Sequence, residues 1–162
     1  GIRVYASFLV LGDLYKWQQG WEAIQFASHQ QLSNLIVFVD DNKKQLDGFT
    51  KDICNPGDFV EKFSAFGFES IRVNGSDIRE IYEGIVQLKQ SNNLSPKCIV
   101  LDTIKGQGVR ELEEMKSNHH LRPTVEERQM LTSVVERLSQ ELEETEWWEV
   151  RKNYDMCIEI SF

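Results

Sequence analysis

The sequence is poor in the residues that build metal and disulfide centres, and it has no long apolar run. Only three cysteines and three histidines occur among its 162 residues. Cys54, Cys98 and Cys157 are odd in number and lack metal-ligand spacing, so they fit a reducing compartment. No stretch approaches the length of a membrane span, and no signal-peptide pattern opens the chain. These absences favour a soluble, cytoplasmic protein without a membrane partner.

Basic residues are also scarce relative to acidic ones. The chain has 18 lysines and arginines against 26 aspartates and glutamates, which gives a formal net charge of −8. Such a balance argues against a nucleic-acid partner. Any anionic ligand must therefore be met locally, by backbone amides, a lysine or a bound cation.

Strand and helix patterns alternate along the chain. The predicted strands are 2–11, 34–39, 68–73 and 97–104, and the predicted helices are 21–31, 58–67, 77–90 and 125–146. The strand at 34–39 is almost wholly apolar and the strand at 97–104 has an apolar centre, which is typical of strands buried on both faces. This alternation predicts an α/β fold with a parallel sheet flanked by helices. We expect one domain over residues 1–146 and a tail over 147–162.

Three predicted strands end in polar or glycine-rich segments: Gly12-Asp13, "DDNKKQLDG" at 40–48, and "KGQGV" at 105–109. Ligands of parallel sheets bind beyond the carboxyl ends of the strands, so the three loops should meet at one edge. A calcium EF-hand is excluded because Lys44 would occupy a ligand position. Asp13 and Asn42 could instead supply oxygen ligands for Mg²⁺. The alternative for 40–48 is a polar turn closed by Gly48.

Two further motifs remain open on their residues alone. The segment "IKGQGV" lacks the third glycine of a dinucleotide fingerprint and is not a P-loop. Its glycines either let backbone amides approach a ligand or simply form a turn. His119 and His120 are adjacent, so at most one of them should face a site, and surface histidines are common.

Several segments together resemble the thiamine-diphosphate-binding domain of transketolases, above all the N-terminal subunits of two-subunit enzymes. The similar segments occur in order: "LGD" at 11–13, "WEAIQFASHQQLSNLIVFVDDNKKQLDG" at 21–48, "FSAFGFESIRVNGSDI" at 63–78 and "DTIKGQGVRELEE" at 102–114. The likeness covers roughly residues 4 to 130. It implies a transketolase-like fold that binds thiamine diphosphate and Mg²⁺ (or Ca²⁺).

The resemblance also assigns roles to individual residues. Asp13, the Asn42 side chain and the main-chain carbonyl of Lys44 would hold the metal ion on the cofactor's diphosphate. His119 would lie at the substrate entrance, with His120 as the alternative. The remaining residues implied near the cofactor are Gly12, Leu46, Asp47, Lys105, Gly106 and Gly108.

The chain departs from the family in two places. The usual "GDGELQEGQVWEA" is replaced by "GDLYKWQQGWEA", which loses a glycine and a glutamate but keeps Glu22. The family domain also extends upstream of the "GDG" strand, so we expect this fold to be incomplete at its N-terminus. The family's activating glutamate belongs to the pyrimidine domain, and therefore this chain alone should not turn over.

The expected activity is two-carbon ketol transfer between sugar phosphates, in an assembly with a C-terminal pyrimidine-domain subunit or a like subunit. A related thiamine-diphosphate enzyme, such as deoxyxylulose-phosphate synthase, is the near alternative. A non-catalytic remnant that serves as an interaction protein is the alternative from another class. An apolar strand at 2–11 would be a hydrophobic edge if left bare, so we expect the chain to fold within a larger assembly.

Overall fold

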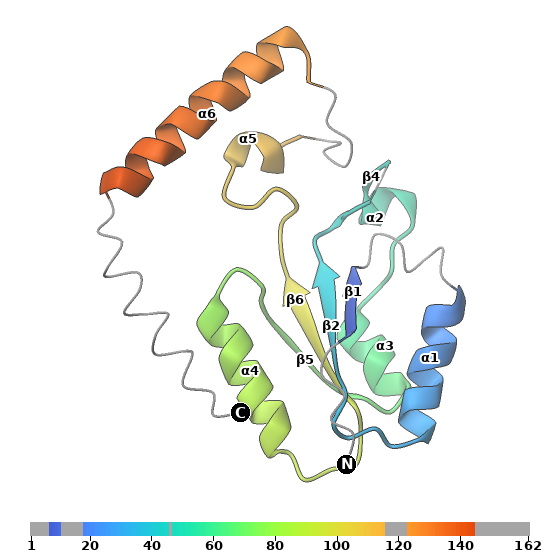
Figure 1. Ribbon diagram of the computed structural model, residues 1–162. Coiled ribbons are helices and arrows are strands. Elements are labelled where there is room, and N and C mark those ends of the chain that lie inside the picture. The colour runs from blue at the N-terminus through green and yellow to red at the C-terminus, as the bar shows by residue number, and fades with distance from the viewer. Residues whose placement is uncertain (1–6, 11–17, 46, 116–122, 145–162) are drawn as a thin grey trace. The chain divides into compact units, whose positions relative to one another are not determined.

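A computed structural model describes residues 7–10, 18–45, 47–115 and 123–144 of the chain (Figure 1). The chain divides into two units, residues 1–120 and 121–162. A four-stranded parallel sheet forms the centre of the larger unit. The sheet order is β1-β2-β6-β5. Its strands are β1 (Ser7–Val10), β2 (Ile36–Asp41), β5 (Glu69–Asn74) and β6 (Lys97–Asp102). All three neighbouring pairs are parallel, so the predicted parallel α/β architecture is confirmed.

Two helices cover one face of this sheet: α1 (Gln18–His29) and α3 (Phe59–Ala65). Their buried side chains share one hydrophobic core with Val37, Val39, Cys98 and Val100 of the strands. Aromatic rings join the two helices, because Trp21 stacks on Phe66 with ring centroids 5.5 Å apart and tilts against Phe63 at 5.9 Å. The helix predicted at 58–67 is therefore confirmed, with Phe59 and Phe63 on its buried face.

The other face carries α4 (Ile78–Gln90), which packs closely on β5. Gly84 makes this approach possible, since a Cβ at that position would lie 3.0 Å from Ile71 Cδ1 and 3.2 Å from Val73 Cγ1. The helix begins as predicted, with Asp77 as its N-cap accepting hydrogen bonds from the amides of Arg79 and Glu80. Helices on both faces bury the central strand β6, and its first four residues are all buried.

The expectation that both apolar strands would be buried on both faces holds for only one of them. In β2, Val37 and Val39 are buried, but Ile36 and Phe38 are only partly buried. Both strands lie between two others, so the physical reason is coverage: α4 packs on β5 and β6, and the second face of β2 is only partly covered by the described residues. An apolar run shows that a strand is buried without showing how completely.

Several short elements were not predicted. A hairpin of β3 (Lys44–Gln45) and β4 (Gly48–Phe49) follows β2, and it leads directly into the single turn α2 (Thr50–Ile53). The short helix α5 (Arg110–Glu113) follows the glycine-rich loop after β6. Elements of two to four residues are too short to show a hydrophobic period in the sequence.

The described part of the second unit is a single helix, α6 (Val125–Glu144), which confirms the helix predicted at 125–146. It begins with a reciprocal cap: Thr124 Oγ1 accepts from the amide of Glu127, and Glu127 Oε2 accepts from the amide of Thr124. Among the described helices none has the length and apolar content needed to cross a membrane. The tail at 147–162 lies outside the described residues.

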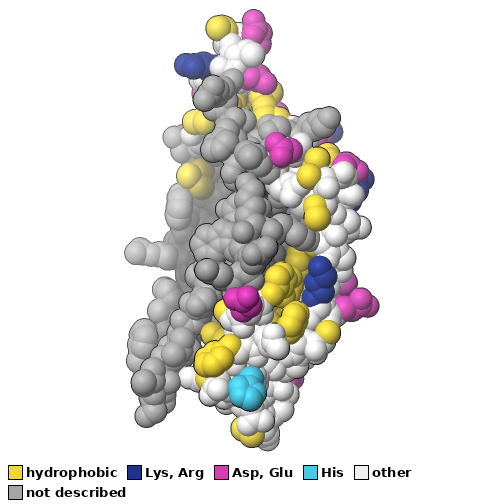
Figure 2. Space-filling model, turned by 90° about the vertical axis from the view of Figure 1, so that its right-hand side faces the viewer, with side chains coloured by type: hydrophobic (Ala, Val, Ile, Leu, Met, Phe, Trp, Pro, Cys, Tyr) yellow, Lys and Arg dark blue, Asp and Glu magenta, His cyan; other side chains and the backbone are white. Residues whose placement is uncertain are grey.

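Truncation of Phe63 tests the core between α1, α3 and the sheet. Phe63 is fully buried, so Phe63→Ala should lower the free energy of unfolding by about 3–5 kcal/mol. The matched control is Phe26→Ala on α1, because hydrophobic side chains reach the surface on that side (Figure 2) and Phe26 is 61% exposed. Urea unfolding of both variants should show a large loss only for Phe63→Ala, and equal losses would contradict this core.

The two described cysteines should differ sharply in reactivity. Burial raises the pKa of Cys98 to about 12, so its thiol stays protonated at neutral pH, whereas Cys54 is exposed. Iodoacetamide at pH 8 should alkylate Cys54 at least about tenfold faster than Cys98 in the folded protein. Peptide mass spectrometry measures both sites, and unfolding in urea should remove the difference. Rapid labelling of Cys98 before unfolding would show that β6 is not buried as described.

Candidate functional site

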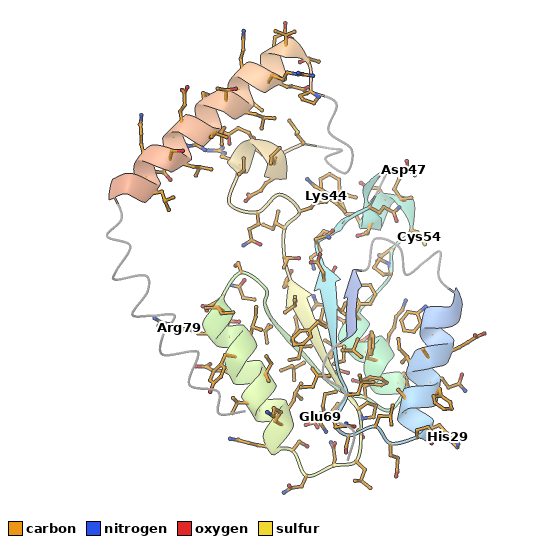
Figure 3. The ribbon with its side chains drawn as sticks, viewed as in Figure 1. His29, Lys44, Asp47, Cys54, Glu69 and Arg79 are labelled. Atoms are coloured by element: carbon orange, nitrogen blue, oxygen red, sulfur yellow. The ribbon has the colours of Figure 1, made fainter. Side chains whose placement is uncertain are left out.

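The carboxyl ends of β2 and β6 lie side by side at one edge of the sheet. Their register pairs Asp40 with Leu101 and Asp41 with Asp102, so the loops that follow both strands leave at the same edge. Lys44 and Asp47 lie at this edge, whereas His29 and Glu69 lie at the opposite one (Figure 3). The prediction that the loops after these two strands meet is confirmed.

The turn after β2 is organised by the side chain of Asn42. Its Oδ1 accepts a hydrogen bond from the Lys44 amide at 3.0 Å, and its Nδ2 donates to Asp40 Oδ2 at 2.9 Å. Lys43, between Asn42 and Lys44 in the chain, adopts φ +63°, a left-handed conformation that a non-glycine residue rarely takes. The hydrogen bond that Asn42 Oδ1 accepts from the Lys44 amide stabilises this tight turn, and it fixes the direction in which the asparagine oxygen points.

The hairpin geometry turns the Lys44 carbonyl away from β4. The Thr50 amide donates to the Lys43 carbonyl at 2.9 Å, and the following pair in the ladder is Lys44 with Phe49. Bonded and non-bonded pairs alternate in an antiparallel ladder, so the main-chain groups of Lys44 face away from β4. The amide and the carbonyl of one strand residue point to the same side. Because the Lys44 amide donates to Asn42 Oδ1, we infer that the Lys44 carbonyl and the asparagine oxygen lie on one side of the turn. Two oxygen ligands of one cation require this arrangement.

The two aspartates before Asn42 are engaged in structural contacts. Besides the bond from Asn42, Asp40 accepts a hydrogen bond from Thr103 Oγ1, which ties the end of β2 to the loop after β6. Asp41 Oδ2 lies 2.5 Å from Lys43 Nζ and 2.7 Å from Arg72 Nη1. The carboxylates thus shape and hold the turn.

Arg72 on β5 joins this turn to α3. Its second guanidinium nitrogen lies 3.3 Å from Asp58 Oδ2, and Asp58 is the N-cap of α3. Burial opposes the charged form of Arg72, but the hydrogen bond to Asp41 and the nearby carboxylates outweigh it and raise its pKa. The Glu61 amide, with a smaller contribution from Arg72, holds the pKa of Asp58 below its usual value. Arg72 and Asp58 therefore both stay ionised at neutral pH.

The glycine-rich loop after β6 is a turn that leads into α5. Gly106 and Gly108 have φ values of +85° and +89°, which favour glycine. The Gly108 amide donates to Glu113 Oε1 at 2.8 Å, so it is used within the loop. The structure thus supports the turn interpretation of these glycines, and contact of the loop with a ligand stays a prediction. Lys105 in the same loop is partly buried.

The structure brings together only part of the predicted set. Asn42 and Lys44 share the turn, and Asp47 is exposed at the tip of the hairpin. The predicted residues that lie outside the described part of the chain are Gly12, Asp13, Leu46, His119 and His120. Within the described part, no group of three or more histidine, cysteine, aspartate or glutamate side chains could hold a metal ion. A metal site at this turn therefore needs the asparagine, a main-chain carbonyl and a further ligand.

Sequence reasoning missed three contributors to this edge: Thr103, Arg72 and the ammonium group of Lys44. Each acts on a residue at least thirty positions away, as in the pairs Thr103 with Asp40 and Arg72 with Asp41. A threonine directly after an apolar strand, beside an aspartate-rich loop, was the one available signal. The other two contacts depend on strand order, which the sequence pattern does not specify.

Comparisons with known proteins agree with this architecture. A sequence model described as "Transketolase, thiamine diphosphate binding domain" matches residues 5–133. The "6-deoxy-6-sulfo-D-fructose transketolase subunit SqwG" of Clostridium sp. (strain MSTE9) is 37% identical over 67% of this chain and 39% of its own length. An apulose-4-phosphate transketolase subunit of Actinobacillus succinogenes is 36% identical over 66% of this chain and 38% of its own length.

A solved structure gives the same result. The transketolase of Campylobacter jejuni superposes with a TM-score of 0.59 at 30% identity, over 66% of this chain and 16% of that one. The transketolase-like fold expected from the sequence is thereby confirmed. This chain spans about two fifths of the length of the two subunits named above. Because the family match covers most of its residues, the chain belongs to the transketolase family and is similar there to the thiamine-diphosphate-binding domain.

Proposed function

We propose that this chain holds the metal-bound diphosphate of thiamine diphosphate at the turn after β2. The observation that carries the proposal is the hydrogen bond from the Lys44 amide to Asn42 Oδ1, beside the pairing of Lys44 with Phe49, from which we infer that the asparagine oxygen and the Lys44 carbonyl share one side of that turn. Asp13, which follows β1, is the proposed third ligand. The ion is Mg²⁺ (or Ca²⁺), since both prefer carboxylate, amide and carbonyl oxygens.

A cation is needed because the protein is acidic. With a net charge of −8, the chain repels a free diphosphate at long range. The nearby cations Lys43 and Arg72 are paired with carboxylates, so little of their charge is left for a ligand. A divalent ion supplies concentrated positive charge where the turn offers only neutral and anionic oxygens.

The proposed reaction is transfer of a two-carbon ketol unit between sugar phosphates. Thiamine diphosphate, when bound, supplies the carbanion chemistry of such transfers. The residues of this chain hold and orient it: Asn42 and Lys44 fix the metal, while Asp47 and the loop of Lys105, Gly106 and Gly108 flank the cofactor. We place His119 at the substrate entrance, with His120 as the alternative.

A partner is part of the proposal. The two relatives described above are named as transketolase subunits, which supports an assembly of more than one chain. We propose that a pyrimidine-domain subunit, or a like subunit, completes the site around the far end of the cofactor. This chain alone should then bind the diphosphate end without turnover.

One observation favours a non-catalytic alternative. The turn is satisfied by its own hydrogen bonds, from Asn42 to Asp40 and from the Lys44 amide to Asn42, so it does not need a metal ion to hold its shape. A remnant of the fold that serves as an interaction protein would keep such a turn. Calorimetric titration with thiamine diphosphate separates the two functions, because a remnant gives no metal-dependent heat.

Replacement of the proposed metal ligands should weaken cofactor binding. Asn42→Ala should lower the affinity for thiamine diphosphate with Mg²⁺ by at least about tenfold, and Asp13→Ala should lower it further. Calorimetry with and without a chelator measures this effect and its dependence on the cation. Asn92→Ala, an exposed amide outside the turn, is the matched control and should bind as wild type. Full affinity in both ligand variants would remove the site assignment.

Replacement of the histidines should separate turnover from binding. In the assembled enzyme, His119→Ala should lower kcat by about tenfold or more while leaving cofactor affinity nearly unchanged. His120→Ala should have a smaller effect. The control is His29→Ala, because His29 lies at the edge of the sheet opposite the site (Figure 3). Steady-state kinetics with a ketose phosphate donor measures kcat for all three variants. Equal, negligible changes in kcat for His119→Ala and His120→Ala would show that neither histidine takes part in turnover.

A further inference from the structure

A buried ammonium group links the turn after β2 to the end of α5. Lys44 is only 4% exposed, and its Nζ donates to the carbonyl of Glu113 at 2.6 Å and to that of Met115 at 2.8 Å. The same Nζ lies 5.4 Å from the centre of the Phe49 ring. These contacts join segments about seventy residues apart in the sequence.

The carbonyls that Lys44 contacts are of a special kind. The last carbonyls of a helix have no amide partner within the helix, and a cation close to them is favourable. A buried ammonium group in turn requires acceptors, because an unpaired buried charge is strongly unfavourable. Each side therefore satisfies the other, and the contact fixes the end of α5 to the hairpin.

The main chain of the same residue forms the turn. The Lys44 amide donates to Asn42 Oδ1, and its carbonyl lies on the side of that oxygen. A shift of the Lys44 backbone toward a bound cation would thus move the base of the side chain that carries the ammonium group.

We propose that Lys44 is a positioning residue: its ammonium group couples occupancy of the turn by a metal-bound diphosphate to the placement of α5 and its end at Met115. This inference rests on the proposed function, because it needs a ligand at the turn. Coupling of this kind is reciprocal, so ordering of α5 also strengthens ligand binding. Lys43 differs: its side chain is half-exposed, and its partners Asp41 and Asp102 are side chains at the strand ends.

Hydrogen exchange on the complete protein in its assembly tests the coupling. The reporters are the amides of Leu112, Glu113, Glu114 and Met115, all of which are hydrogen-bonded within α5 and its end. The variant is Lys44→Met, which keeps the main-chain carbonyl and the apolar stem but loses the ammonium group. Lys43→Met is the matched control, and Lys44→Arg tests rescue by a second cation.

The expected result has three parts. In wild type and Lys43→Met, Mg²⁺ with thiamine diphosphate should slow exchange at these amides by about threefold or more, and Lys44→Arg should retain part of this slowing. In Lys44→Met, exchange should be faster without ligand and unchanged by ligand. By linkage, the affinity of Lys44→Met for thiamine diphosphate with Mg²⁺, measured by calorimetry, should be lower than that of wild type by the factor by which the ligand slows exchange in wild type. Amides of α4, such as Ile81, should exchange alike in every variant and so report an intact fold.

The outcomes distinguish this coupling from the proposed function. Binding heat in wild type without slowing of the α5 amides overturns the coupling and leaves the proposed function standing, and this comparison needs no variant. Slowing that persists in Lys44→Met overturns it as well. An absence of metal-dependent heat in wild type overturns the proposed function and the coupling together.

Discussion

The parallel pairing of β2 with β6 is the constraint on which the rest of the site depends. Parallel strands in register must end together, and here the pairing of Asp41 with Asp102 places the ends of two distant segments beside each other. Helices on both faces bury β6, so this pairing cannot slip without exposing apolar side chains. The buried strands therefore fix the positions at which the two following loops begin.

The turn above these strands is held by polar contacts from several elements. Asp40 is bonded to Thr103 of the next loop, and Asp41 is bonded to Arg72 on β5. Such contacts hold the backbone of the turn in place, and this preorganisation would lower the entropic cost of the proposed binding. The left-handed residue Lys43 stays in its unfavourable conformation because the surrounding bonds determine the turn on both sides.

The sequence predicted the elements whose signal is periodic and local. The helix after Asp77 and the strand at 97–104 were both found, because an N-cap and an apolar run depend on neighbouring residues alone. The hairpin of β3 and β4 was missed, since two-residue strands have no period. Asn42 was predicted to be a site residue from its place after a strand, and that assignment stays a prediction. The tether from Lys44 to Glu113 was not, because it joins residues 69 positions apart and depends on how α5 folds back.

The close approach of α4 to β5 at Gly84 has a consequence for the order of folding. Glycine in the middle of a helix lowers its intrinsic stability by about 1 kcal/mol relative to alanine, so α4 is a poor helix in isolation. It gains stability when Gly84 meets Ile71 and Val73 on the assembled strand. Among the described strands β5 pairs only with β6, and its own docking depends on that pairing. We therefore expect α4 and β5 to form together as one cooperative unit on the edge that β6 supplies.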